Sequence, residues 1–403
     1  MRLLTIFVNY NDTEMKRFCI FVLGIIFSIS ITANNPKFSV LTCWPGDEAY
    51  SLYGHTGLRY CDEERDMDIV FNYGYFDFDS PNFAWRFILG ETDYMVGAVD
   101  YDHFCQEYIQ RGSLIVGQVL ELTPEQENEL LELLVDNCSV RNRTYRYNYF
   151  YNNCTTKVRD KIEQVAGPLS YDAVAQYPTF RDALNSLLGD HPWFAFGINT
   201  LLGADIDRPA TVRELQFIPG IFMHDLDSCY MVNAAGERTP VVAMKQLVLP
   251  EGEDDAPMQS NFTPFNVSLL LLLMTFVIML CEVRKKKTFW GYDVLLMSVQ
   301  GIAGLLLLFM ALFSQHPAVG NNWAIILLNP LALILMPILV SRIRKHKSLS
   351  LAWLQVVFVV LFLLSAMLSL QVYPLPLYFC AIALLVRSLF LIYKENICEL
   401  SRF

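Results

Sequence analysis

The chain has 403 residues, 54% of them hydrophobic, and a formal net charge of −11 at pH 7. Its mean hydropathy of +0.32 is too high for an ordinary soluble protein. The sequence contains no basic face with interleaved aromatic residues and no glycine-rich phosphate loop. These features exclude the common nucleic-acid-binding and nucleotide-binding classes.

The apolar residues are concentrated in the last third of the chain. Residues from about 36 to 262 have the polarity of a globular domain, whereas 266–393 are almost continuously apolar. We therefore predict an N-terminal signal at 1–35, an exported domain at 36–262 and a membrane domain at 263–403. The exported domain is long enough to bury a core of its own.

The N-terminus resembles an export signal. An apolar run at 18–32 follows Lys16 and Arg17 and ends at the small residues Ala33, Asn34 and Asn35. This pattern is typical of a secretory signal peptide, because the run is shorter than the ~20 residues that span a bilayer. An N-terminal anchor helix is the alternative, and either one exports the following domain. The pattern is complete from Met15 onward, which makes Met15 a candidate for the true start.

The exported domain is expected to be α+β. Strands are predicted at 50–60, 67–78 and 113–122. A helix follows, with Thr123 as its N-cap, proline at the first helical position and Gln126 closing a capping box.

Three polar residues lie on the first two predicted strands. His55 follows Gly54, and a glycine lets another backbone or a substrate approach closely. The next strand carries Asp68 and Asn72. Alone, a histidine on a strand is more often a core or surface residue than a catalytic one.

Cys154 is predicted to lie in the first turn of a helix. Asn152 or Asn153 can cap this helix, and Gly167 can end it. Its apolar stripe consists of Val158, Ile162 and Val165. At this position the helix dipole and unpaired N–H groups favour a thiolate and can face an oxyanion. The alternative is a buried structural cysteine or a disulfide partner.

His55 and Cys154 together suggest nucleophilic acyl transfer, because a histidine base can activate a thiol. Asn72 is the first candidate to orient the imidazole and Asp68 the second. If the strand is regular, Arg59 shares the face of His55 and can contact a phosphate group. A surface salt bridge is the other role for Arg59. No spacing of cysteine and histidine suggests a metal site.

Five apolar segments are predicted to cross a membrane: 266–283, 290–313, 323–341, 350–370 and 374–393. The basic runs 284–287 and 342–347 follow the first and third segments, whereas the loops 314–322 and 371–373 carry no Lys or Arg. Basic loops stay cytoplasmic, so the exported domain is expected on the opposite side. Arg387 lies inside the last segment, where it can snorkel toward the cytoplasmic end.

Four stretches of sequence resemble one family. They are CWPGDEAYSLYGHTGLRY, VFNYGYFDF, YNYFYNNCTTKVRD and DIDRPAT, in this order before several membrane segments. They resemble the Lnb-type lipoprotein N-acyltransferases, whose exported part is called the Lnb N-terminal periplasmic domain. The histidine-before-cysteine order is also similar to that of circularly permuted papain-like folds. The resemblance therefore implies a permuted papain-like α+β domain followed by an all-α membrane domain of about five helices.

The resemblance also implies an activity and two substrates. A phospholipid would donate an acyl chain to the α-amine of a diacylglyceryl-cysteine lipoprotein, with Cys154 and His55 as catalytic residues. Tyr53, Arg59 and Asn153 are the candidate substrate contacts. No cofactor, metal or nucleic acid is expected, and the location implied is the bacterial inner membrane with the catalytic domain in the periplasm.

Two other functions fit the same residues. A membrane-anchored NlpC-like peptidase or amidase would use the same pair on cell-wall peptides, but a single span would be enough to anchor it. A non-catalytic membrane-assembly protein is the other alternative, and a disulfide at Cys154 would favour it.

Overall fold

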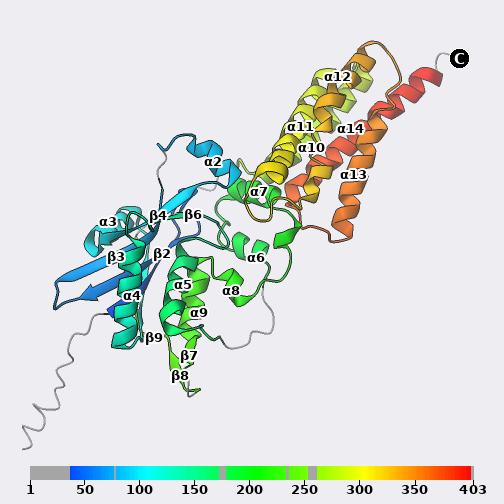
Figure 1. Ribbon diagram of the computed structural model, residues 1–403. Helices are drawn as coiled ribbons and strands as arrows, with labels where there is room; N and C mark the ends of the chain where they lie inside the picture. Colours follow the sequence, from blue (N-terminus) through cyan, green and yellow to red (C-terminus); the bar gives the residue numbers. More distant parts are fainter. Residues whose placement is uncertain (1–36, 77–78, 172–177, 233–235, 253–260, 401–403) are drawn as a thin grey trace, which may run out of the picture.

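The computed structural model describes residues 37–76, 79–171, 178–232, 236–252 and 261–400, and the predicted signal lies outside them. Figure 1 shows a domain of sheet and helices at the N-terminal side and a helical bundle at the C-terminal side. The structure therefore has the expected order of an α+β domain followed by an all-α domain.

The exported domain is built on one antiparallel seven-stranded sheet with the order β6-β4-β3-β2-β1-β5-β9. Its strands are β1 (Lys37–Cys43), β2 (His55–Asp62), β3 (Met67–Tyr75), β4 (Asp93–Asp100), β5 (Ile115–Leu120), β6 (Thr144–Arg146) and β9 (Val242–Leu249). A separate two-stranded sheet consists of β7 (Tyr230–Val232) and β8 (Arg238–Pro240). The predicted strand at 113–122 is shorter in the structure.

Helices cover both faces of the large sheet. The main core lies between the sheet, where it presents Leu58 and Tyr60, and α5 (Cys154–Ala166), which presents Val158 and Ile162. α4 (Pro124–Asn137) and α9 (Pro219–Ser228) lie on the same face, and α4 begins with the predicted capping box. α3 (Tyr101–Arg111) covers the opposite face through Phe104.

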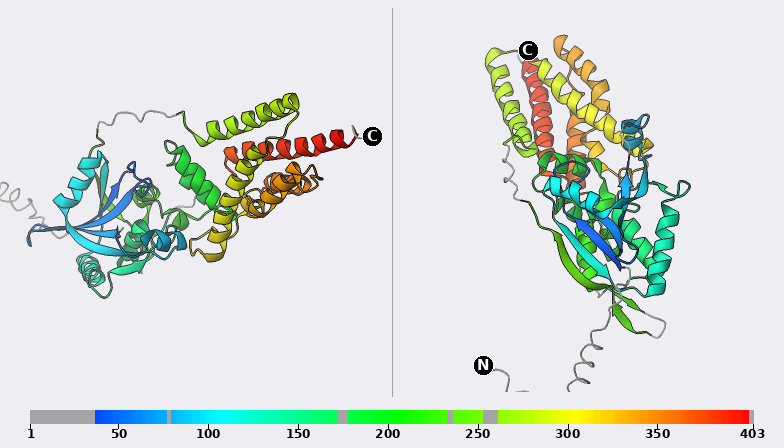
Figure 2. Two further views of the ribbon diagram at one scale, coloured as in Figure 1. Left: turned by 90° about the horizontal axis from the view of Figure 1, so that it is seen from above. Right: turned by 90° about the vertical axis from the view of Figure 1, so that its left-hand side faces the viewer.

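The remaining helices of the exported domain are α2 (Phe83–Leu89), α6 (Phe180–Asn185), α7 (Pro192–Leu201), η1 (Ala204–Ile206) and α8 (Val212–Leu215). α2 and α7 lie at the end that meets the bundle (Figures 1 and 2), and α8 lies beside α5. α7 contains the aromatic residues Trp193, Phe194 and Phe196, and Phe196 packs against the core of the bundle.

The bundle contains five apolar helical segments. They are α10 (Pro264–Lys285), α11 (Trp290–Phe313), η2 (Trp323–Ile326) continued by α12 (Leu331–Arg344), α13 (Ala352–Met367) and α14 (Leu375–Leu400). In the described residues, four of these segments are long and apolar enough to cross a membrane, and α13 is shorter, with 16 residues. Pro330 separates η2 from α12, and Pro337 lies inside α12.

The loops without basic residues hold the exported domain on the bundle. The N–H of Gly203 donates to the carbonyl of Ala318 at 2.7 Å, and the amide of Asn322 donates to the carbonyl of Thr200 at 2.8 Å. The N–H of Val372 donates to Asp207 at 2.9 Å, and Asp207 is also paired with Arg181. These loops therefore lie on the same side as the exported domain.

Arg387 does not snorkel. It is 2% exposed and donates to both carboxylate oxygens of Asp293 on α11, each at 2.7 Å. It also donates to Glu282 on α10 at 2.9 Å. Lys394 lies 3.5 Å from Glu282, so two cations balance two carboxylates. Because burial makes an unpaired charge costly, Arg387 holds α10, α11 and α14 together.

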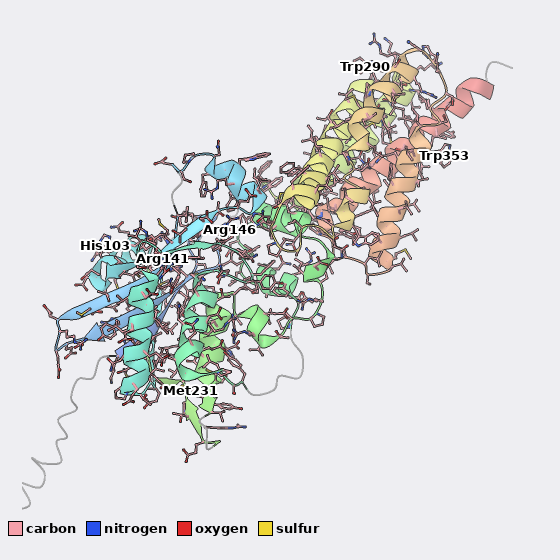
Figure 3. The ribbon with its side chains drawn as sticks, in the orientation of Figure 1. His103, Arg141, Arg146, Met231, Trp290 and Trp353 are labelled. Atoms are coloured by element: carbon pink, nitrogen blue, oxygen red, sulfur yellow. The ribbon has the colours of Figure 1, made fainter. Side chains whose placement is uncertain are left out.

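The membrane topology can be tested by cysteine labelling in intact cells. We expect a membrane-impermeant maleimide to label Gly320→Cys, in an exposed loop beside the exported domain, but not Lys285→Cys. Figure 3 shows Trp290, five residues beyond Lys285, at the end of the bundle remote from that domain. Labelling of Lys285→Cys above the background of the parent chain would overturn this topology.

The buried ion pairs predict a large effect of one substitution. Arg387→Met should destabilise the bundle by about 3–5 kcal/mol, because two carboxylates stay buried without their partner. Thermal unfolding in detergent measures this loss of stability through the unfolding midpoint, with Arg344→Met at the exposed end of α12 as the control. Equal midpoints for the two variants would show that the buried pairs contribute little.

Candidate functional site

The N-cap of α5 places Cys154 at the first helical position. The side chain of Asn153 accepts from the N–H of Thr156 at 2.9 Å, and the hydroxyl of Thr156 accepts from the N–H of Asn153 at 2.8 Å. The amide nitrogen of Asn153 donates to the carbonyls of Tyr149 and Phe217 at 3.1 and 2.7 Å. Asn153 therefore has a structural role at the N-cap, where both polar groups of its buried side chain are bonded within the protein.

A pair of threonines attaches the first turn of α5 to the start of β2. The hydroxyls of Thr155 and Thr56 lie 3.1 Å apart, and both side chains are fully buried. The same hydroxyl of Thr155 lies 3.8 Å from the sulfur of Cys154. Thr56 directly follows His55, so this contact brings the thiol to the histidine across 99 residues of chain.

Asn72 on β3 holds the imidazole of His55. The Nε2 atom of His55 lies 2.6 Å from the Oδ1 atom of Asn72. An amide oxygen only accepts, so Nε2 carries the proton and donates, and Nδ1 is the basic nitrogen that remains for the thiol. Of the two predicted orienting residues, Asn72 therefore has the geometry for that role.

Tyr75 is a neighbour of the Asn72 side chain. Burial raises the pKa of Tyr75, and a hydrogen bond with the Asn72 side chain partly offsets that rise. The amide oxygen of Asn72 is the atom that faces His55. Sequence reasoning missed Tyr75, although it stands three residues after Asn72 in FNYGYFDF.

The thiol and the imidazole change each other's acidity. Burial raises the pKa of Cys154, but the charge of His55 and hydrogen bonds from His55 and the Thr56 backbone outweigh burial and lower it to about 7. Burial likewise lowers the pKa of His55, but the charge of Cys154 and its hydrogen bond raise it overall. The two groups therefore form a thiolate–imidazolium pair near neutral pH.

The other cysteines of the exported domain behave differently. Burial is the main cause that raises the pKa of every one of them: Cys43, Cys61, Cys105, Cys138 and Cys229. The eight cysteines whose side chains the structure describes are free thiols. Cys154 is thus not a disulfide partner in this structure, and its lowered pKa distinguishes it from its neighbours.

Asp68 and Arg59 contact each other rather than the site. Both carboxylate oxygens of Asp68 accept from Arg59, at 2.7 and 2.6 Å. The guanidinium also lies 3.5 Å above the ring centre of Tyr101 on α3. Asp68 is therefore engaged away from His55, and Arg59 forms the salt bridge that was one of its two predicted roles.

Tyr53 belongs to an aromatic cluster between the site and α7. Its ring centre lies 5.3 Å from that of Tyr149 and 6.5 Å from that of Phe194. Burial raises the pKa of Tyr53 to about 12, so it stays a neutral phenol. Its half-buried ring thus packs between the segment before Cys154 and α7.

Further tyrosines surround the thiol and were not recognised in the sequence. Burial is the main cause that raises the pKa values of Tyr94, Tyr145 and Tyr147, and the negative charge of Cys154 contributes to each rise. Two of them lie in the segment RTYRYNYFYNN before Cys154, where the density of tyrosine is itself a usable signal. In the described residues no group of three or more His, Cys, Asp or Glu side chains is placed to hold a metal ion.

The lowered pKa predicts the pH dependence of thiol alkylation. Modification of Cys154 by iodoacetamide should be half-maximal near pH 7, because the thiolate is the reactive form. In His55→Ala the midpoint should rise, since burial then acts without the opposing charge. Peptide mass spectrometry measures the extent of alkylation at each pH from about 5 to about 9, with Cys61 as the internal control. A midpoint at Cys154 as high as that at Cys61 would contradict it.

Comparison with known families agrees with the order of the two domains. The family described as the Lnb N-terminal periplasmic domain matches residues 28–186, and the family described as the Lnb transmembrane domain matches residues 256–396. Neither the curated proteins nor the solved structures give a match. Both Lnb parts occur in the expected order, so the chain belongs to the Lnb family, as a multi-pass membrane protein with a periplasmic domain.

Proposed function

We propose that this protein transfers an acyl chain from a phospholipid to the α-amine of the N-terminal diacylglyceryl-cysteine of lipoproteins, through a thioester on Cys154. The observation that supports this most is the linked set of Cys154, His55 and Asn72, with a thiol pKa of about 7. The site lies in a domain that is hydrogen-bonded to the loops of a membrane bundle.

In the first half-reaction, the Cys154 thiolate attacks the ester carbonyl of the phospholipid. The oxyanion that forms faces the first turn of α5, where the N–H groups ahead of Thr156 have no acceptor inside the helix and the N–H of Thr156 is held by the Asn153 cap. The ester C–O bond then breaks, and protonated His55 gives its proton to the leaving lysophospholipid oxygen. The acyl chain remains on sulfur as a thioester.

In the second half-reaction, the α-amine of the lipoprotein attacks the thioester carbonyl. His55, now neutral, accepts a proton from the amine through Nδ1 as the new C–N bond forms. The Cys154 thiolate leaves, and the amide product departs. Asn72 keeps the imidazole in one tautomer through both steps, because its oxygen accepts only from Nε2–H.

The position of the site suits two lipid substrates. Phospholipid and diacylglyceryl lipoprotein are both held in the bilayer, so neither has to leave the membrane to reach a site fixed above it. The membrane proposed is the bacterial inner membrane, with the site on the periplasmic side.

The covalent intermediate tests this proposal. Purified full-length protein incubated with phospholipid alone should carry a fatty acyl group on the Cys154 peptide, detected by mass spectrometry after digestion. Diacyl lipopeptide added afterwards should remove that group and become N-acylated. An unmodified Cys154 peptide, together with cleavage of cell-wall stem peptides, would instead assign the protein as a peptidase.

Variants of the pair sharpen this test. Cys154→Ser and His55→Ala should each lower lipopeptide acylation by on the order of 10²–10⁴-fold, and the double variant should lose little more. Cys61→Ser is the matched control, because Cys61 is a free thiol on the strand of His55. Near-wild-type turnover in Cys154→Ser would rule out the thioester.

A further inference from the structure

α2 is unusually apolar for a short helix of an exported domain. Its seven residues, FAWRFIL, include one charged side chain, Arg86, which donates to Asp93 at 2.7 Å. Trp85, Phe87 and Ile88 are 53%, 45% and 36% exposed. Large apolar side chains exposed side by side mark a surface that contacts something other than water.

The position of α2 indicates that this surface meets lipid. The ring centre of Trp85 lies 5.3 Å from that of Phe309 on α11. The backbone N–H of Gln315 donates to the carbonyl of Leu89 at 2.7 Å. The last turn of α11 exposes Leu312 and Phe313, at 65% and 62%. Figures 1 and 2 show α2 beside this end of α11, so its apolar side chains continue the lipid-facing surface of the bundle.

A row of stacked rings runs from α2 to the site. We call Phe87, Phe83, Phe76, Tyr94 and Tyr147 the aromatic row. Successive ring centres lie 6.1, 5.9, 5.0 and 4.2 Å apart, and each pair is within 27° of parallel. The row joins four parts of the chain: α2, the segment after β3, the strand β4 and the residue after β6.

The two ends of the aromatic row lie in different surroundings. Phe87 at the outer end is 45% exposed, whereas Tyr94 is 9% exposed. At the inner end, burial and the negative charge of Cys154 raise the pKa values of Tyr94 and Tyr147. The aromatic row therefore starts at the lipid-facing surface and ends at two tyrosines whose pKa values the charge of Cys154 raises.

We infer that α2 lies in the periplasmic interface of the bilayer and that the aromatic row guides a lipid acyl chain from there to Cys154. This inference rests on the proposed function. The thiol belongs to a domain above the bundle, so the donor ester has to rise out of the bilayer while its chain stays shielded from water. The continuous series of stacked rings supplies an apolar surface along that route.

The position of α2 can be tested without any activity. In bilayers, the emission of Trp85 is the difference between the wild-type protein and Trp85→Phe. This component should be quenched by phospholipids brominated near the glycerol end and not by acrylamide, which is dissolved in water. Trp323→Phe is the positive control, because Trp323 is 39% exposed at the same end of the bundle. Quenching of the Trp85 component by acrylamide alone would overturn the membrane position of α2.

The guiding role can be tested by comparing two acyl donors. The rate of Cys154 acylation is measured with a long-chain phospholipid and with p-nitrophenyl acetate, which has no chain to guide. In Phe87→Asp the phospholipid rate divided by the acetate rate should fall at least about tenfold, because a carboxylate disfavours an apolar chain beside it. Val140→Asp, at an 80% exposed position outside the aromatic row, should keep the wild-type ratio.

The outcomes separate the two proposals. A wild-type ratio in Phe87→Asp, or an equal loss with both donors, would overturn the guiding role while leaving the thioester chemistry intact. A wild-type protein acylated by p-nitrophenyl acetate but never by phospholipid would overturn the proposed function itself.

Discussion

The contact between the first turn of α5 and the first residues of β2 sets the chemistry of this protein. The threonine after Cys154 and the threonine after His55 meet at 3.1 Å in a fully buried position, so neither element can shift without the other. Asn72 on the neighbouring strand then holds the imidazole at 2.6 Å. Because burial alone would raise the pKa of the thiol, a pKa of about 7 depends on keeping this alignment.

The junction with the bundle places this alignment relative to the membrane. A Cβ atom at Gly203 would lie 2.1 Å from the carbonyl oxygen of Asn321, so a side chain there would force the two parts of the protein apart. The pairing of Asp207 with the N–H of Val372 adds a second attachment, and it gives a structural role to the DIDRPAT element. Inside the bundle, Arg387 ties three helices together. The bundle thus acts as a rigid base as well as an anchor.

Local patterns in the sequence predicted several of these features, because they depend on neighbouring residues. Examples of such features are the capping box at Thr123, the helix that begins at Cys154 and the basic loops on one side of the bundle. Asp68 and Arg59 could not be placed from sequence, because strand register brings residues nine apart into a salt bridge. Arg387 could not be placed either, since its partners lie 94 and 105 residues away.

The proposed mechanism imposes one more demand, which concerns water. A thioester that waits for an amine is open to hydrolysis, so the enzyme has to favour the amine over a solvent present at far higher concentration. Several tyrosines surround the thiol, and burial raises the pKa of each one, so they line the site as neutral rings. Such surroundings exclude water and also strengthen the attraction between thiolate and imidazolium, because the local dielectric is low. The enclosure that would protect the intermediate is therefore also part of what makes the thiol reactive.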